Sequence, residues 1–458
     1  MLRRCAAYLL VAILCLCLLI LPIRSAQQNA HVISSQGIIN GNKSLGWLHT
    51  DGKYIKDADG NIVHLYGATI IEPAYIGDHL RYNQPISQRI ATLKSMGINF
   101  VRLIIDRAKW DANVDTNGDG IGNRNFTIQV GQALSDAGIM FVTGIMGAPS
   151  EPWPQDQWAS YVINNMIMPF EHMSGFVGVF ILNEPHTEQW GGINYDSVSS
   201  VYWDSAKYVC AQIHAHNPNI LIIVHANGWS KWGFSNILKT DPIPTPNVCY
   251  TFHYYFGYAP QMNPYLGWMS GGPKGVLDSN YEELVNRGMP FYKSYYQGNY
   301  TLAKQQLEQY FLTNYFWAAT DYNLPIVNDE WGFSADEEGY FSWRECPTDG
   351  CTWIRGRVAD TLLSPRGTPA GVGPYPAVTY CPQDGTALPK PHDHVEPGWP
   401  QCFLDQVDIF NKYMNLWANF AFWPKTYSGY GIVQDDMTTL APQGVALKEA
   451  IARAVGAP

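Results

Sequence analysis

Short apolar runs recur along this chain with helical or loop stretches between them, and this alternation limits the available folds more than any other feature. The runs are rich in β-branched and aromatic residues, as buried strands are. There are eight of them, at residues 62–68, 100–105, 140–145, 177–182, 221–225, 248–253, 325–328 and 418–423. Residues 86–96 and 301–319 carry apolar side chains at three- and four-residue spacing, which predicts amphipathic helices.

Eight strand-and-helix units in one chain predict an α/β protein built as an eight-stranded (β/α) TIM barrel. An open dinucleotide-binding sheet is disfavoured because no Gly-x-Gly-x-x-Gly follows the first strand. At 458 residues, of which 46% are hydrophobic, the chain supplies the core of one large domain. We expect residues 27–458 to form that domain, with residues 331–401 as a long loop insertion between strands seven and eight.

Residues 1–26 have the pattern of an export signal. Arg3 and Arg4 precede an apolar run from Cys5 to Ile23, whose length fits either a cleaved signal peptide or a retained signal anchor. We favour cleavage near Ser25 or Ala26, although Arg24 stands where a small residue is preferred. The expected location is therefore extracellular, either secreted or anchored to the outer face of the membrane.

The cysteine count agrees with export. Three of the nine cysteines lie in the leader, and the six that remain are Cys210, Cys249, Cys346, Cys351, Cys381 and Cys402. An even number outside a leader indicates disulfides. We expect a disulfide-stapled insertion with the pairs Cys346–Cys351 and Cys381–Cys402; zinc is the weaker alternative because no matching Cys-x-x-Cys follows.

The charge balance excludes one class of partner. The chain has 29 basic and 39 acidic residues, so it offers no uniformly positive surface to nucleic acid. Its 16 Trp and 28 Tyr suit the faces of sugar rings, although a large core also uses such residues.

Polar or aromatic residues end several predicted strands, among them Glu184, His225, His253 and Glu330. The carboxyl ends of barrel strands converge on one mouth, so these side chains share a site. Glycoside hydrolysis needs two facing carboxyl groups, and Glu184 and Glu330 follow strands four and seven. If Glu330 points into the mouth, alternation sends Asp329 away from it. A single glutamate there would be read as a surface or capping residue, but the pair predicts a glycosidase.

The segments around both glutamates resemble a known family. Asn183-Glu184-Pro185 looks like the Asn-Glu-Pro signature of glycoside hydrolase family 5, the cellulase family of a retaining barrel clan, and Glu330-Trp331-Gly332 is similar to its nucleophile segment. The resemblance implies Glu184 as acid/base, Glu330 as nucleophile, and no required cofactor.

Other positions match the family in order along the chain. The resemblance implies that Arg102 keeps the nucleophile ionised and that Asn183 binds the sugar 2-hydroxyl. It also implies that His253 and Tyr255 contact the catalytic pair and that Trp423 forms the floor of the subsite for the cleaved sugar. Trp229 is a further candidate sugar platform, and an ordinary packing role is the alternative for each. The family's histidine beyond strand three is missing from residues 143–149, which leaves the substrate open.

A second motif has the spacing of a calcium loop. Oxygen-bearing side chains alternate around Gly120 in the sixth position, at Asp115, Asn117, Asp119 and Asn123. Position twelve is not acidic, so a solvated turn is the alternative to a structural calcium site.

The sequence as a whole predicts a retaining endo-β-1,4-glucanase that acts on a β-linked polysaccharide. A β-mannanase, another β-glycosidase, a transglycosylase of the same fold and a catalytically inert carbohydrate-binding barrel are the alternatives. We expect a monomer that meets a membrane only through an uncleaved N-terminal anchor.

Overall fold

The computed structural model describes residues 46–70, 85–115, 120–146, 153–185, 199–226, 230, 237–256, 290–296, 298–333, 399–423, 431–434 and 436–456. Within them, eight parallel strands close into a barrel in the order β10-β3-β4-β5-β6-β7-β8-β9. The strands are β3 Leu65–Ile70, β4 Phe100–Asp106, β5 Met140–Met146, β6 Phe176–Phe180, β7 Leu221–His225, β8 Val248–Phe256, β9 Ile326–Phe333 and β10 Leu416–Asn419. The predicted barrel and its eight strands are confirmed, although the last strand, predicted at 418–423, is found at Leu416–Asn419.

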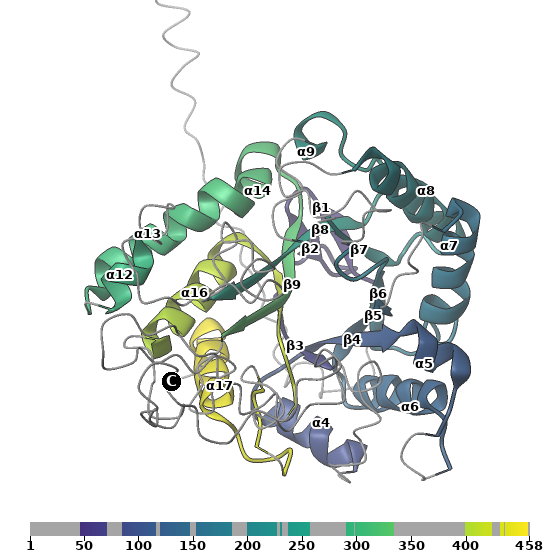
Figure 1. Cartoon of the computed structure of the whole chain (residues 1–458), viewed down its shortest axis with the longest axis horizontal. Helices are drawn as coiled ribbons and strands as arrows, with labels where there is room; N and C mark the ends of the chain where they lie inside the picture. Colours follow the sequence, from purple (N-terminus) through teal and green to yellow (C-terminus); the bar gives the residue numbers. More distant parts are fainter. Residues whose placement is uncertain are drawn as a thin grey trace, which may run out of the picture. The chain divides into compact units, whose positions relative to one another are not determined.

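Helices surround the strands in a ring (Figure 1). They are α4 Ile86–Ser95, α5 Arg107–Ala112, α6 Asn123–Asp136, α7 Gln155–Tyr161, η2 Val162–Ile167, α8 Ser200–His216, α9 Ile237–Thr240, α12 Phe291–Tyr296, α13 Tyr300–Phe311, η4 Leu312–Phe316, α14 Trp317–Tyr322, α16 Trp399–Tyr413 and α17 Pro442–Ala454. Both predicted helices are present; the second is α13, η4 and α14 in succession.

Alternation along each strand divides the core in two. In β4, Phe100 and Ile104 point into the barrel, whereas Val101 and Leu103 pack between the sheet and the helices. Arg102 shares the inward face with Phe100 and Ile104, so the strand itself directs a guanidinium into the barrel.

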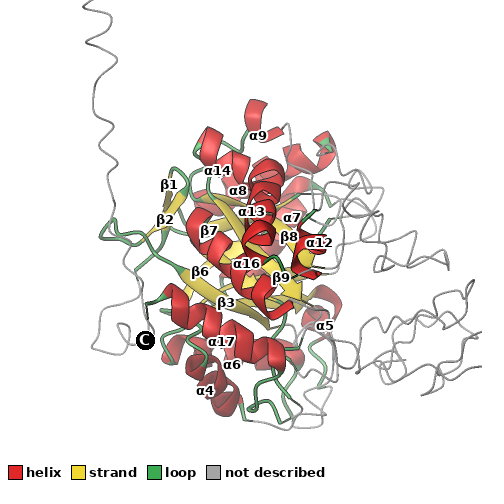
Figure 2. Ribbon diagram, turned by 90° about the vertical axis from the view of Figure 1, so that its left-hand side faces the viewer, coloured by secondary structure: helices red, strands yellow, loops and turns green. Residues whose placement is uncertain are grey.

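A short hairpin that the sequence analysis did not predict precedes the barrel. Its strands are β1 His49–Asp51 and β2 Tyr54–Lys56, and Figure 2 shows it at one end of the barrel. Leu48 and Ile55 join the apolar cluster inside the barrel, together with residues that begin the barrel strands. The hairpin therefore closes the end opposite the mouth.

Strand β9 contains one extra residue. Thr251 and His253 on β8 pair with Val327 and Glu330 on β9, so the one residue between them on β8 opposes two residues on β9. Strand β10 shows the same mismatch against β9, over the same stretch of that strand. A bulge of this kind interrupts the in-and-out alternation of side chains.

The disulfide prediction is wrong for three cysteines. Cys210, Cys249 and Cys402 carry free thiols, so the pair Cys381–Cys402 does not form. Each of the three is fully buried in the apolar core, where a thiol packs as a small hydrophobic side chain. The pair Cys346–Cys351 lies outside the described residues.

The predicted leader, residues 1–26, also lies outside the described residues, as does most of the predicted insertion at residues 331–401. Among the helices that the structure describes, none combines the length and the apolar character needed to cross a membrane.

Candidate active site

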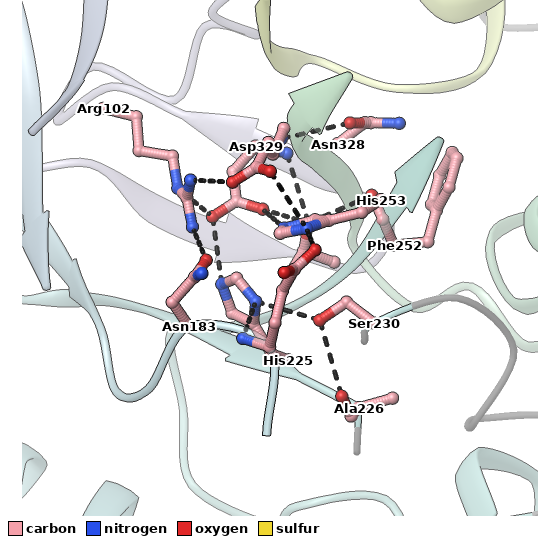
Figure 3. A network of polar contacts seen from close by, with 12 residues as sticks. Arg102, Asn183, His225, Ala226, Ser230, Phe252, His253, Asn328 and Asp329 are labelled. Atoms are coloured by element: carbon pink, nitrogen blue, oxygen red, sulfur yellow. Dashed lines mark hydrogen bonds and ion pairs between the residues drawn. The ribbon is translucent and has the colours of Figure 1, made fainter. Parts of the chain in front are cut away.

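The predicted strand-end residues meet at the carboxyl ends of the barrel strands. Arg102 comes from β4, His225 ends β7, His253 lies on β8 and Glu330 on β9. Glu184 follows β6, the fourth strand of the barrel. The structure therefore brings together residues that lie up to 228 positions apart in the chain (Figure 3).

Arg102 is completely buried and contacts three side chains. Its Nε lies 2.8 Å from Oδ2 of Asp329, its Nη1 donates to Oε2 of Glu330 at 2.5 Å, and its Nη2 donates to Oδ1 of Asn183 at 2.5 Å. Burial opposes the charge, but Asp329 and Glu330 outweigh it and raise the pKa of Arg102. A permanent cation thus faces two carboxylates.

Asp329 lies inside this network, so the prediction that it points away from the mouth is wrong. The extra residue in β9 lets Asp329 and Glu330 both face inward. Oδ1 of Asp329 accepts from the Thr251 hydroxyl at 2.5 Å, and Oδ2 faces Arg102. Burial raises the pKa of Asp329, but Arg102 and His225 reverse this and hold it well below its usual value.

His253 bridges Glu184 and Asp329. Its Nδ1 donates to Oε1 of Glu184 at 2.6 Å, and its Nε2 donates to Oδ1 of Asp329 at 3.1 Å. Nδ1 also lies 3.7 Å from Oε1 of Glu330. Burial lowers the pKa of His253, but Glu330 and Glu184 overcome it and raise the pKa to about 9. The ring is therefore an imidazolium at neutral pH, with both nitrogens as donors.

His225 is in the opposite protonation state. The backbone N–H of Glu184 donates to its Nδ1 at 3.4 Å, so the ring proton lies on Nε2, which donates to Oδ2 of Asp329 at 3.1 Å. The Ser230 hydroxyl contacts the same Nδ1 at 3.0 Å. Burial lowers the pKa of His225 to about 4, which Asp329 only partly opposes. Two neighbouring imidazoles, 4.8 Å apart, thus share one carboxylate but differ in charge.

The two glutamates face one another in the mouth. A carboxylate oxygen of Glu184, one of Glu330 and a His253 nitrogen all lie within 4.8 Å of one another. The Glu184 side chain is 16% exposed and that of Glu330 is 7% exposed. Glu184 has a left-handed backbone with φ of 44°, an uncommon conformation for a residue with a Cβ.

Two groups here have the spacing of metal ligands. They are His225, His253 and Asp329, and Glu184, His253 and Glu330. The donor atoms of the first group are already engaged in hydrogen bonds, and Arg102 and protonated His253 supply positive charge that disfavours a further cation. We therefore assign both groups to the hydrogen-bond network.

Of the other residues predicted to bind the substrate, the structure describes Asn183 and Trp423 in full, and Tyr255 by its backbone only. Asn183 lies beside Arg102 as expected for a residue of the mouth, and Trp423 is buried next to Phe420, with ring centroids 5.4 Å apart. Tyr255 lies on β8 opposite Gly332. The side chain of Tyr255 and the whole of Trp229 lie outside the described residues.

The predicted calcium loop stays a prediction. Asn117 and Asp119 lie outside the described residues. Oδ2 of Asp115 accepts from the backbone N–H of Gly120 at 2.7 Å, and Asn123 is buried at the start of α6.

Sequence reasoning missed the parts of the network that lie behind the glutamates: Asp329, Thr251 and Ser230. It placed His225 at the mouth without a role. No pattern in the sequence singles out Asp329, because alternation from Glu330 sends it outward and only the extra residue in β9 turns it inward.

Comparisons with known proteins agree with this geometry. The profile of the family described as "Cellulase (glycosyl hydrolase family 5)" matches residues 57–360. The search of curated proteins found no match.

Solved structures with a similar fold include three glucan-degrading enzymes. An endocellulase from Pyrococcus horikoshii is 14% identical, with a TM-score of 0.53 over 91% of this chain and 100% of that one. The major endoglucanase of Xanthomonas campestris pv. campestris is 13% identical, with a TM-score of 0.54 over 88% of this chain and 99% of that chain. A β-glucanase from Saccharophagus degradans is 16% identical, with a TM-score of 0.53 over 90% of this chain and 95% of that one. The family match, which spans most of the chain, shows that this protein is a glycoside hydrolase and belongs to glycosyl hydrolase family 5.

Proposed function

We propose that this protein is a retaining endo-β-1,4-glucanase in which Glu330 is the nucleophile and Glu184 the acid/base. The observation that carries the proposal is the approach of carboxylate oxygens of the two residues to within 4.8 Å. Retaining enzymes hold their carboxyl groups about 5–5.5 Å apart, whereas inverting enzymes leave about 6.5–9.5 Å for a water. The observed distance therefore favours the retaining arrangement, in which one carboxylate is the nucleophile and the other carboxyl group is the acid.

The contacts of each glutamate support its assigned role. Arg102 donates to Glu330 and favours its ionised form, as a nucleophile requires. Glu184 is the more exposed of the pair, so it can reach a leaving oxygen and later a water. In the first step Glu330 attacks the anomeric carbon while Glu184 protonates the departing oxygen. In the second step Glu184 removes a proton from water, which displaces Glu330 from the sugar.

β-Linked glucan is the substrate that the comparisons favour. The three solved relatives named above are an endocellulase, an endoglucanase and a β-glucanase. Mannan is the second candidate, because the histidine expected beyond strand three is missing and the identity of the preferred sugar is therefore not fixed by that position. Asn183, held by Arg102, is the proposed contact of the sugar 2-hydroxyl. We also propose that the protein is exported, acts as a monomer and needs no cofactor for catalysis.

Azide rescue tests the two roles separately. We expect Glu330→Ala to be inactive on polysaccharide, and azide to fill the vacated space and yield the product of inverted configuration. Glu184→Ala should keep its first step on aryl cellobiosides whose leaving group needs no proton, and azide should then yield the retained product. Proton NMR of the glycosyl azides reads the configuration directly.

Wild-type protein assayed on glucans, mannans and xylans serves as the reference. Rescue with the opposite stereochemistry would reverse the assignment, and near-normal polysaccharide activity in either alanine variant would refute the mechanism. Preference for mannan over glucan would correct the substrate only.

A further inference from the structure

The contacts behind the two glutamates converge on one carboxylate. Charged or titratable groups face Asp329 from three other strands of the barrel: Arg102 from β4, His225 from β7 and His253 from β8. Thr251 completes the set with a hydroxyl donor, and the Asp329 side chain has no exposed surface. A buried carboxylate with this many donors is held in a single orientation.

Two of these partners lead to Glu184. Through His253, Asp329 is one ring away from the Glu184 carboxylate, since Nε2 of that ring contacts Asp329 and Nδ1 contacts Glu184. Through His225, it is one ring away from the Glu184 backbone, since Nε2 contacts Asp329 and Nδ1 accepts from the Glu184 N–H.

The hydrogen bond from the Glu184 N–H to His225 stabilises an uncommon backbone, because Glu184 has a left-handed conformation. Such a conformation costs free energy for a residue with a Cβ and persists only where neighbouring groups hold it. His225 accepts from Glu184 only while its Nδ1 carries no proton, and Asp329 favours that tautomer by accepting the proton on Nε2.

We propose that Asp329 is a positioning residue for the acid/base Glu184, acting on its side chain through His253 and on its backbone through His225. The proposal rests on the function proposed above, and it adds a residue that touches neither the substrate nor the reacting atoms. The alternative is that Asp329 positions the nucleophile Glu330 instead, because Arg102 contacts both carboxylates.

The substitution Asp329→Asn distinguishes these roles because it keeps the shape and removes the charge. The measurement is kcat/KM for aryl β-cellobiosides with leaving groups of graded pKa, because kcat/KM reports the first step whatever the leaving group. If Asp329 acts through Glu184, the variant should lose about 100-fold or more on poor leaving groups and less than about tenfold on dinitrophenol, because only poor leaving groups need the acid.

The matched control is Thr143→Val on β5. Thr143 is also buried, and its hydroxyl donates to the carbonyl of Met166 at 2.5 Å, away from the glutamates. This variant should lose stability and keep the wild-type dependence on leaving group. If Asp329→Asn loses the same factor in rate for every leaving group, or loses none, the proposal is overturned. The proposed function still stands in that case, provided that the wild type is active. A wild type inactive on every glycan would overturn both.

Nitrogen-15 NMR of the unchanged protein tests the same arrangement if Asp329→Asn fails to fold. At pH 7 we expect His253 to be protonated on both ring nitrogens and His225 on Nε2 alone. A neutral His253, or a His225 protonated on Nδ1, would overturn the proposal.

Discussion

At the scale of single residues, the site depends on two histidines that share Asp329 but hold different charges. His253 bonds two carboxylates and stays protonated, whereas His225 accepts from a backbone N–H and stays neutral. The residue type is identical, so the difference comes from the surroundings: Glu330 and Glu184 raise the pKa of His253, whereas burial and the charges of His253 and Arg102 lower the pKa of His225. Stability therefore depends on pH in opposite ways on either side of neutrality.

We expect the free energy of unfolding to reach its maximum near pH 6.5. The folded pKa of His225 is about 4, below the unfolded value of about 6.5, so the unfolded state binds more protons between these values and stability falls on acidification. The folded pKa of His253 is about 9, so its contribution is complete below about pH 6.5 and is lost as the pH rises through 9. Urea unfolding across this range measures the curve.

Two variants separate the limbs of that curve. His225→Phe should flatten the slope on the acidic side between pH 4 and 6.5, and His253→Phe the slope on the alkaline side. Equal slopes in wild type and both variants would show that other groups control the pH dependence.

At the scale of elements, the strands meet through glycines that leave no room for a side chain. A Cβ at Gly178 on β6 would lie 2.2 Å from the carbonyl oxygen of Leu221 on β7, and a backbone atom cannot rotate away. We expect Gly178→Ala to cost about 1–3 kcal/mol through overpacking. Urea unfolding at neutral pH provides the measurement.

Gly131 on α6 provides the matched control. A Cβ there would meet the Phe170 ring at 3.0 Å, and a ring has more freedom to shift than a carbonyl in a barrel. Alanine also gains about 1 kcal/mol over glycine inside a helix. We expect Gly131→Ala to be close to neutral, and a cost equal to that of Gly178→Ala would argue against the overpacking explanation.

Elements also show how far sequence reasoning extends. The eight barrel strands are predictable because buried parallel strands form continuous apolar runs. The β1–β2 hairpin escapes the same reasoning because strands of three residues have too few positions for a periodic pattern. Glu184 and Glu330 could be placed from their strands, whereas the inward turn of Asp329 depends on the register of β9 against two neighbours.

At the scale of the whole molecule, free thiols are spread through the core rather than confined to one segment. Cys210 lies on α8, Cys249 on β8 and Cys402 on α16, and burial raises the pKa of each thiol. We expect a thiol reagent to label none of these three in the native protein and at least three thiols after unfolding without reductant. Fewer than three under denaturing conditions would show that a pair forms after all.

The extra residue in β9 corresponds to a single codon. Trp331 packs outside the barrel against Phe403, and Val327 points inside. A regular strand one codon shorter could satisfy both contacts and still present Glu330 to the mouth, but Asp329 would then face the helices. Gain or loss of a single codon therefore separates a barrel in which one carboxylate of this strand faces the mouth from a barrel in which two do.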